Sequence, residues 1–350
     1  MKKSARFFVL ILLAVLAFET AYIFSQAGLV KPITFVKKAV SKPLLAYTFD
    51  NLRKTEFPKN QIALGEVVSE SNDSVSRMFY FLVPKTPGSK IMEKVSGLAN
   101  IPKKTGNYPV IVMFRGYVPD NTYKPGIGTQ PVAGYLAKNG YITLAPDFLG
   151  YGQSAKPADD PFENRFQTYT TALTLLSSLP TLNNGLNASY SGTISADLDH
   201  VGIWGHSNGG HIALSTLEIS GVTYPTVLWA PVSTSFPYSV LFYSDDSDDQ
   251  GKALRKTLAD FEANYNTDQF SPTNYFKWIK APLEINQGTQ DQSVPYWWSD
   301  NLVSILKKNG VSVNYLTYPG ADHNMLPSGW PDAALDTLNF YNQSFSKNKL

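Results

Sequence analysis

One serine in this sequence lies where its hydroxyl could act as a nucleophile. Residues 205–209 are Gly-His-Ser-Asn-Gly, with the serine at position 207, and they follow the apolar run 201–204. Gly-x-Ser-x-Gly between a strand and a helix is typical of a nucleophile elbow, a tight turn that presents the serine oxygen at the edge of a sheet. Such a turn leaves no room for side chains two residues on either side of the serine. Because the motif is short, an ordinary glycine-rich turn with an incidental serine is the alternative.

A serine is a weak nucleophile unless a base accepts its proton and a third group orients that base. Two of the four histidines, His211 and His323, come after Ser207 in the sequence. His211 lies one turn into the helix expected after the elbow, where we predict a packing or surface role. His323 lies in a loop directly after the last predicted strand, residues 311–318, and this loop can reach back over the sheet edge. We therefore predict that His323 is the general base.

The third member should be a carboxylate that lies between the serine and the histidine in chain order. Asp291 comes just beyond the predicted strand 283–286, 32 residues before His323. A carboxylate there can accept the imidazole N–H, fix its tautomer and stabilise the imidazolium. Asp300 and Asp322 are alternatives by proximity, but the first should begin a helix and the second would have to fold back. We predict Asp291.

A tetrahedral intermediate also needs hydrogen-bond donors for its oxyanion. We expect one donor to be the backbone N–H of Asn208, the residue after the nucleophile. The second should come from the loop after the predicted strand 110–114. That loop begins Arg115-Gly116-Tyr117, and the Tyr117 N–H is our candidate. The alternative is that Gly116 merely ends a strand.

Composition excludes several other chemistries. The sequence has no cysteine, so disulfides, thiolate zinc sites and cysteine nucleophiles are excluded. With only 4 histidines, a multi-histidine metal site is not expected, and the chemistry above needs no metal or cofactor. The 30 Lys+Arg against 28 Asp+Glu lack the basic excess of a nucleic-acid-binding protein. We expect a small-molecule ester or a short peptide as substrate.

The first 27 residues are expected to direct export. Basic residues precede an apolar run at residues 7–18, which Glu19 interrupts. A spanning helix of about 20 residues is reached only if the run continues to residue 24. The two interpretations are a signal peptide cleaved after Ala27 and an uncleaved membrane anchor through residues 7–24. Either one places the catalytic domain outside the cytoplasm, as a secreted, periplasmic or membrane-anchored protein.

From about residue 76 onward, short β-rich runs alternate with longer stretches of helical period. This alternation predicts an α/β fold with a mostly parallel central sheet flanked by helices, in one catalytic domain over residues 76–350. We expect residues 28–75 to be a linker and N-terminal extension, and residues 233–265 to be a small helical insertion. The predicted strands are residues 77–83, 110–114, 141–144, 201–204, 226–229, 283–286 and 311–318.

Taken together, these motifs resemble the α/β-hydrolases. They are specifically similar to the catalytic domain of the prolyl oligopeptidase family and its dienelactone-hydrolase-like relatives. The likeness covers about residues 75–345 and implies the α/β-hydrolase fold and acyl transfer by a Ser-His-Asp triad. It depends on the segments 145–154, 202–210, 271–282 and 288–295 and on His323.

Two features depart from the pattern of these relatives. Many of them carry His-Gly or Gly-Gly in the oxyanion loop, whereas this sequence has Arg115-Gly116. We expect Arg115 to be a partly exposed structural residue, with binding of a substrate carboxylate as the alternative. Peptidases of the family also carry a β-propeller before the hydrolase domain, and residues 28–75 are too few to form one.

We therefore expect an exported serine hydrolase that cleaves an ester or amide bond, most simply a carboxylic ester hydrolase. A prolyl oligopeptidase-family peptidase acting on short peptides is the alternative within catalysis. A non-catalytic surface module on a hydrolase scaffold is the alternative from another class. Six aromatic residues expected at the same sheet edge could line an acyl pocket, with core packing as the default: Phe148, Tyr151, Trp229, Tyr296, Trp297 and Trp298.

Overall fold

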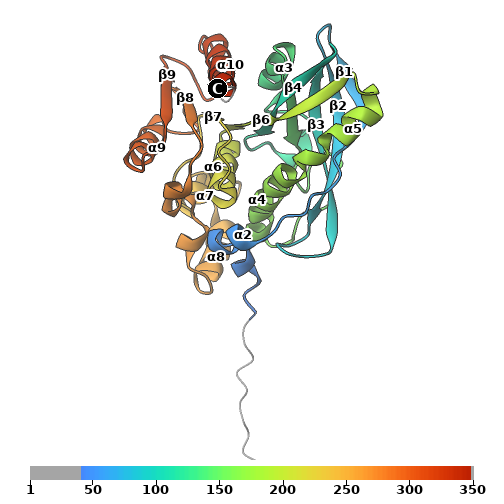
Figure 1. Ribbon diagram of the computed structural model, residues 1–350. Helices are drawn as coiled ribbons and strands as arrows, with labels where there is room; N and C mark the ends of the chain where they lie inside the picture. Colours follow the sequence, from blue (N-terminus) through green and yellow to red (C-terminus); the bar gives the residue numbers. More distant parts are fainter. Residues whose placement is uncertain (1–40, 348–350) are drawn as a thin grey trace, which may run out of the picture. The chain divides into compact units, whose positions relative to one another are not determined.

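One continuous sheet carries the loops that contain the candidate residues. In the computed structural model, which describes residues 41–347, nine strands form this sheet in the order β1-β2-β3-β5-β4-β6-β7-β8-β9 (Figure 1). Strands β5, β4, β6, β7, β8 and β9 pair in parallel, while β1, β2, β3 and β5 pair antiparallel. The strands are β1 (Ala63–Glu70), β2 (Ser74–Pro84), β3 (Met92–Pro102), β4 (Gly106–Phe114), β5 (Ile142–Pro146), β6 (Ile194–His206), β7 (Thr226–Trp229), β8 (Leu283–Gly288) and β9 (Val313–Tyr318).

Helices flank this sheet, so the predicted α/β architecture is confirmed. The α-helices are α2 (Phe49–Lys54), α3 (Gln130–Lys138), α4 (Pro161–Ser178), α5 (Leu182–Tyr190), α6 (Asn208–Ser220), α7 (Tyr238–Leu241), α8 (Lys252–Glu262), α9 (Tyr296–Lys308) and α10 (Trp330–Lys347). The 3-10 helices are η1 (Pro43–Tyr47), η2 (Asp120–Thr122), η3 (Leu179–Thr181), η4 (Ser244–Asp246), η5 (Thr267–Phe270), η6 (Pro272–Asn274) and η7 (Phe276–Trp278).

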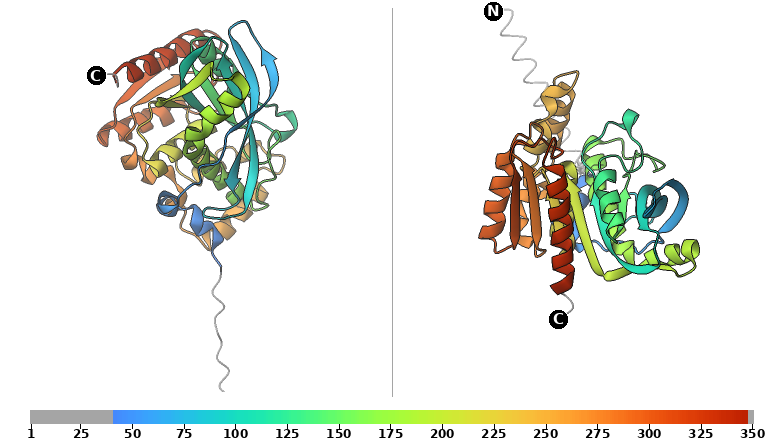
Figure 2. Two further views of the ribbon diagram at one scale, coloured as in Figure 1. Left: turned by 45° about the vertical axis from the view of Figure 1, so that its right-hand side comes forward. Right: turned by 90° about the horizontal axis from the view of Figure 1, so that it is seen from above.

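Alternate residues of β4 enter two different hydrophobic cores. Val110, Val112 and Phe114 belong to the core that includes α4 and α6, and Ile111 and Met113 belong to the core that includes α3 and α10. Helices α4 and α10 accordingly lie on different sides of the sheet (Figure 2). A strand covered on both faces is apolar throughout, which is why this strand could be predicted from a short apolar run.

Parallel strands bring their carboxyl ends to the same edge of a sheet, where α/β proteins place their sites. Phe114 at the end of β4 pairs with Gly205 of β6, and Gly288 at the end of β8 pairs with Tyr318 at the end of β9. The segments that follow these strands carry all the candidate site residues, with Asn208 as the first residue of α6: Tyr117, Ser207, Asn208, Asp291 and His323.

Residues 233–265 contain the predicted small helical insertion, with α7, η4 and α8. The ring of Phe162, at the start of α4, packs on Phe236 and Phe261 of this segment, with centroid distances of 5.7 and 4.9 Å. These aromatic contacts anchor the insertion to the helix that begins beside the carboxyl edge of the sheet.

Strand β3 is not predicted by the sequence pattern, and neither is β1. Two residues of β3, Gly97 and Asn100, are unfavourable in strands. A side chain at Gly97 would clash with the Phe79 ring on β2. Asn100 donates hydrogen bonds to Gln130 and Thr143, both distant in sequence. Long-range contacts that no local pattern reveals therefore stabilise this strand.

The N-terminal part of the described chain also differs from the prediction of a linker and extension over residues 28–75. Phe49 and Leu52 of α2 are fully buried in the core, and β1 joins the sheet from Ala63 onward. The compact unit begins at Pro43, well before the predicted domain boundary at residue 76.

The predicted export segment, residues 1–27, lies outside the described residues. Among residues 41–347, no helix is both long enough and apolar enough to cross a membrane. The prediction of export through a signal peptide or an anchor therefore stays a prediction.

Candidate active site

Ser207 occupies a strained turn between β6 and α6. Its backbone angles are φ 57° and ψ −122°, a conformation that residues with a side chain rarely adopt. Two backbone hydrogen bonds hold it there, from the Ser207 N–H to the Trp229 carbonyl (2.9 Å) and from the Val232 N–H to the Ser207 carbonyl (3.0 Å). This is the geometry expected of a nucleophile elbow.

The glycines around Ser207 are required by close packing. A side chain at Gly209 would clash with the Phe114 carbonyl oxygen, and a Cβ at Gly205 would lie 2.6 Å from the Gly209 carbonyl oxygen. A Cβ at Gly116 would lie 2.9 Å from the Cβ of Ser207. Gly116 therefore does more than end a strand, because it brings the loop after β4 directly against the serine.

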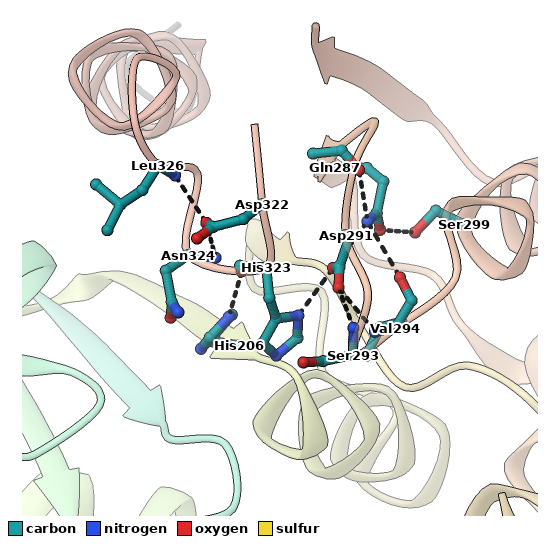
Figure 3. Close-up of polar contacts among 11 residues, drawn as sticks. His206, Gln287, Asp291, Ser293, Val294, Ser299, Asp322, His323, Asn324 and Leu326 are labelled. Carbon is teal, nitrogen blue, oxygen red and sulfur yellow. Dashed lines mark hydrogen bonds and ion pairs between the residues drawn. The ribbon is translucent and has the colours of Figure 1, made fainter. Parts of the chain in front are cut away.

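Asp291 and His323 form a hydrogen-bonded pair (Figure 3). The Nδ1 of His323 lies 2.8 Å from Oδ2 of Asp291, whose side chain is fully buried. The carboxylate also accepts the backbone N–H groups of Ser293 and Val294 and the side-chain amide of Gln287, at 2.8 to 3.0 Å. Because an ionised carboxylate only accepts hydrogen bonds, Nδ1 carries the proton and Nε2 is left as a base.

The electrostatic environment keeps Asp291 ionised. Burial by itself would raise the pKa of its carboxyl group. The hydrogen bond and charge of His323, with the N–H groups of Val294 and Ser293, outweigh this effect and hold the pKa of Asp291 below its ordinary value. The group is therefore a permanent hydrogen-bond acceptor for the imidazole near neutral pH.

The two alternative carboxylates form other contacts. Asp300 accepts a hydrogen bond from the Tyr315 hydroxyl at 2.7 Å. Asp322 accepts the backbone N–H groups of Asn324 and Leu326, both at 2.8 Å. Asp322 thereby shapes the loop that carries His323 without orienting its ring.

His206, for which no sequence motif indicates a role, connects the His323 loop to the elbow. The Nε2 of His206 lies 2.9 Å from the backbone carbonyl oxygen of His323, and the two rings are 4.6 Å apart. A carbonyl can only accept, so His206 donates. Burial and the neighbouring His323 lower the pKa of His206 to about 4, so the ring is neutral near neutral pH. Its position next to Ser207 was the only sequence signal for this role.

The hydroxyl of Ser207 has no hydrogen-bond partner among residues 41–347. The structure thus joins Asp291 to His323 and the His323 loop to the elbow, but it shows no direct hydrogen bond between Ser207 and His323. The two predicted oxyanion donors are free to bind a ligand. Neither the Asn208 N–H nor the Tyr117 N–H has a hydrogen-bond acceptor within the described part of the chain.

Two family models and several known proteins are similar to parts of this chain. The sequence model of the prolyl oligopeptidase family matches residues 184–348, and that of chlorophyllase matches residues 88–224. Dipeptidyl peptidase 4 of Trichophyton rubrum is 31% identical over 134 residues, which are 37% of this chain and 16% of that protein. A protein of Escherichia coli K12 assigned as a carboxymethylenebutenolidase is 25% identical over 69% of this chain and 80% of its own length.

Solved structures show the same fold. Acetyl xylan esterase from Paenibacillus sp. R4 has a TM-score of 0.59 at 16% identity and covers 89% of this chain and 99% of its own. The acylaminoacyl peptidase of Pyrococcus horikoshii has a TM-score of 0.51 at 17% identity and covers 83% of this chain and 50% of its own. The chain has the α/β-hydrolase fold. It spans only 16% of the length of the curated dipeptidyl peptidases it matches.

A cavity of about 250 Å³ opens beside the elbow. Tyr117 and Asn208, the residues of the two predicted donors, contribute to its wall. Phe148 and Tyr151, two of the six aromatic residues considered for an acyl pocket, line it as well. The other four aromatic residues considered for this role do not line it: Trp229, Tyr296, Trp297 and Trp298.

Arg115 is buried, with only 6% of its surface exposed, so the expectation of a partly exposed side chain was wrong. Its guanidinium donates to the carbonyl oxygens of Gly116 (2.9 Å) and Asp147 (3.2 Å). It also lies over the rings of Tyr151 and Tyr123, at 4.1 and 4.6 Å from their centroids. These contacts fix the loop that presents Gly116 to the serine.

The described part of the chain contains no cluster of three or more His, Cys, Asp or Glu side chains that could hold a metal ion. The candidate site contains the hydroxyl, imidazole, carboxylate and backbone donors described above. That set suffices for acyl transfer, which needs a nucleophile, a base, an orienting acid and an oxyanion site.

Proposed function

We propose that this protein is a serine hydrolase that cleaves carboxylic esters through an acyl-enzyme intermediate. Ser207 Oγ attacks the ester carbonyl carbon while Nε2 of His323 takes the hydroxyl proton. The same proton then passes to the departing alcohol oxygen. A water molecule repeats the sequence on the acyl-enzyme and releases the acid. Asp291 orients His323, and the N–H groups of Asn208 and Tyr117 bind the oxyanion.

The observation that carries this proposal is the anchored Asp291–His323 pair. The Asp291 carboxylate fixes the His323 ring through a 2.8 Å hydrogen bond. His206, the residue before the nucleophile, donates a hydrogen bond to the backbone carbonyl of His323. A surface module without catalysis would have no need for this arrangement beside a strained serine. Catalytic hydrogen bonds to a nucleophile are often long before substrate binds, so the free hydroxyl of Ser207 is compatible with the mechanism.

A peptidase is the second candidate, because the match to the prolyl oligopeptidase family covers Ser207, Asp291 and His323. The charge of the adjacent cavity favours an ester instead. Its charged lining residues are Arg115 and Arg165, and none of its lining residues is acidic. A peptide with a protonated amino terminus needs carboxylates nearby, and this cavity would repel it.

Export is part of the proposal. The basic and then apolar sequence of residues 1–24 supports it. The protein would be secreted, periplasmic or held by an anchor through residues 7–24. Sequencing the amino terminus of exported material tests this: a start at residue 28 indicates cleavage after Ala27, and a start at Met1 indicates a retained anchor.

The central experiment uses Ser207→Ala. We expect hydrolysis of 4-nitrophenyl butanoate to fall by roughly 10⁴-fold or more, with the melting curve unchanged, and labelling by a fluorophosphonate probe to disappear. Aminoacyl 4-nitroanilides should be poor substrates of the native protein. Ser220→Ala, at the far end of α6, is the matched control and should keep full activity. Native activity in Ser207→Ala, or folded protein that resists the probe, would refute the mechanism, and a preference for anilides would favour the peptidase.

A further inference from the structure

The cavity beside the elbow has an unusual charge. Two arginines, Arg115 and Arg165, contribute to its wall, together with the oxyanion-donor residues Tyr117 and Asn208. No lining residue is acidic. The Nε atoms of both arginines are buried and have no hydrogen-bond partner among residues 41–347. A cavity whose charged lining residues are both cationic favours an anionic ligand.

No carboxylate of residues 41–347 lies within ion-pair distance of Arg165, on α4. Its Nη2 lies 3.4 Å from Nε2 of His211, which also lies 2.7 Å from the Tyr169 hydroxyl. Burial and then the Arg165 charge lower the pKa of His211 well below its ordinary value. His211 is therefore a neutral acceptor, and the positive charge of Arg165 remains uncompensated.

Arg115 differs because its contacts are largely made within the protein. Its two terminal nitrogens donate to backbone carbonyls. Asp147, near the same guanidinium, has its carboxylate held by the hydroxyls of Ser96 and Tyr123. Arg115 thus lies near the buried carboxylate of Asp147 but donates to the backbone carbonyl of that residue. Its role is to fix the oxyanion loop. The charge that a ligand would neutralise is that of Arg165.

Arg165 lies beside the helix that begins just after the nucleophile. His211, which contacts Arg165, follows Ser207 by four residues along α6, and its N–H points to the Ser207 carbonyl at 3.4 Å. Arg165 and Asn208, the residue after the nucleophile, line the same cavity. An anion at Arg165 and an acyl group on Ser207 would therefore lie in one cavity.

We propose that the cavity binds an acyl group that ends in a carboxylate, as in the half-ester of a short dicarboxylic acid, and that Arg165 selects it. This inference depends on the proposed function, since the same Ser207 attacks the ester. A guanidinium and a carboxylate match in a planar, two-point hydrogen-bonded pair. Hydrolysis leaves the distal carboxylate unchanged: the ester bond breaks, the alcohol takes the serine proton, and water releases the free dicarboxylate.

The test compares two methyl esters that differ only at the end of the acyl chain. Monomethyl glutarate carries a carboxylate where methyl pentanoate carries a methyl group, and both release methanol. We expect the native protein to prefer monomethyl glutarate in kcat/KM by at least about tenfold. Arg165→Gln should lower this preference about tenfold to a hundredfold, and Arg165→Lys should restore part of it. Arg255→Gln, which removes a surface arginine paired with Asp245, is the control and should leave the preference unchanged.

A binding measurement without turnover tests the role of Arg165 independently of whether Ser207 is catalytic. Calorimetric titration of monomethyl glutarate into Ser207→Ala, with and without Arg165→Gln, measures the affinity without turnover. We expect the Arg165→Gln change to weaken binding about tenfold or more. Equal binding, or an unchanged ester preference in folded Arg165→Gln or Arg165→Lys, would overturn the inference even if Ser207 is catalytic. An Arg165-dependent preference for 4-acetoxybutanoate over butyl acetate, without one for monomethyl glutarate, would overturn the assignment to the acyl side.

Discussion

On one side of the elbow, the loops after β8 and β9 hold a carboxylate whose two oxygens both accept hydrogen bonds from the protein. On the other side, the loop after β4 and the start of α4 hold two arginines whose Nε atoms have no partner among residues 41–347. The first side is complete without a ligand. The second places two cationic side chains at the wall of a cavity that has no acidic lining residue.

This difference separates the chemistry from the choice of substrate. Proton transfer needs the same geometry for every ester, so a fully hydrogen-bonded Asp291 and an anchored His323 stabilise one arrangement in advance. A cation without a partner is unfavourable when partly buried. Arg165 therefore stabilises the protein least when the cavity holds no anion and most when a carboxylate occupies it. Changes on the first side should alter rate for all esters, and changes on the second should alter selectivity.

The largest effect is expected from Asp291→Asn. An asparagine amide can donate to Nδ1 and favour the tautomer in which Nε2 carries the proton, so the base is lost. We expect kcat to fall about 10⁴-fold for both methyl esters, with the preference for monomethyl glutarate retained. Steady-state kinetics on the ester pair measures both quantities. Asp300→Asn, which changes a carboxylate bonded to Tyr315, is the control, and an equal loss in that variant would move the acid to position 300.

His206→Phe tests whether the chemical side needs its anchor. Loss of the N–H donor to the His323 carbonyl should lower kcat about tenfold to a hundredfold with a smaller change in KM. His206→Gln, which keeps a donor, should recover part of the rate. A change in ester preference in place of a loss of kcat would show that the two sides are not separate.

The same residue gives a pH dependence with a definite sign. The pKa of His206 is lowered to about 4 from 6.5, so the unfolded chain binds the additional proton between these values. The free energy of unfolding should therefore fall as the pH drops from about 6.5 to about 4, by at most on the order of 3 kcal/mol from this group. Denaturant unfolding at several pH values should show a shallower loss in His206→Gln. An identical slope in the two proteins would mean that the buried ring does not titrate in this range.

Much of the chemical side could be predicted from the sequence, because its signals are local or ordered along the chain. The glycines next to Ser207 reflect contacts within the elbow, and the order of Asp291 and His323 follows the order of β8 and β9. His206 was not predicted, since its partner is a backbone carbonyl of His323, 117 positions away. Sequence spacing carries no information about such a contact.

The selectivity side could not be predicted in the same way. The spacing of the apolar residues in α4 indicates which side chains face the core. It does not indicate which other residues the polar side chains of α4 contact. Arg165 comes to the cavity only because α4 packs beside α6, a contact across 46 positions at His211. The exposure of Arg115 was also misjudged, because the aromatic rings that cover it come from the separate segments of Tyr123 and Tyr151.

The smallest expected effect is that of salt, and it asks whether charge alone distinguishes the two sides. Raising sodium chloride from about 0.05 to about 0.5 M shortens the screening length and supplies a competing anion. We expect kcat/KM for monomethyl glutarate to fall about two- to fivefold, because attraction to Arg165 contributes to its binding. Methyl pentanoate has no charge to screen, and its kcat/KM should stay nearly constant. In Arg165→Gln the two esters should respond alike. Since salt does not alter the buried hydrogen bonds of Asp291, a parallel decline of both esters in the native protein would place the sensitivity in the chemical step and remove the charge of the cavity as the source of selectivity.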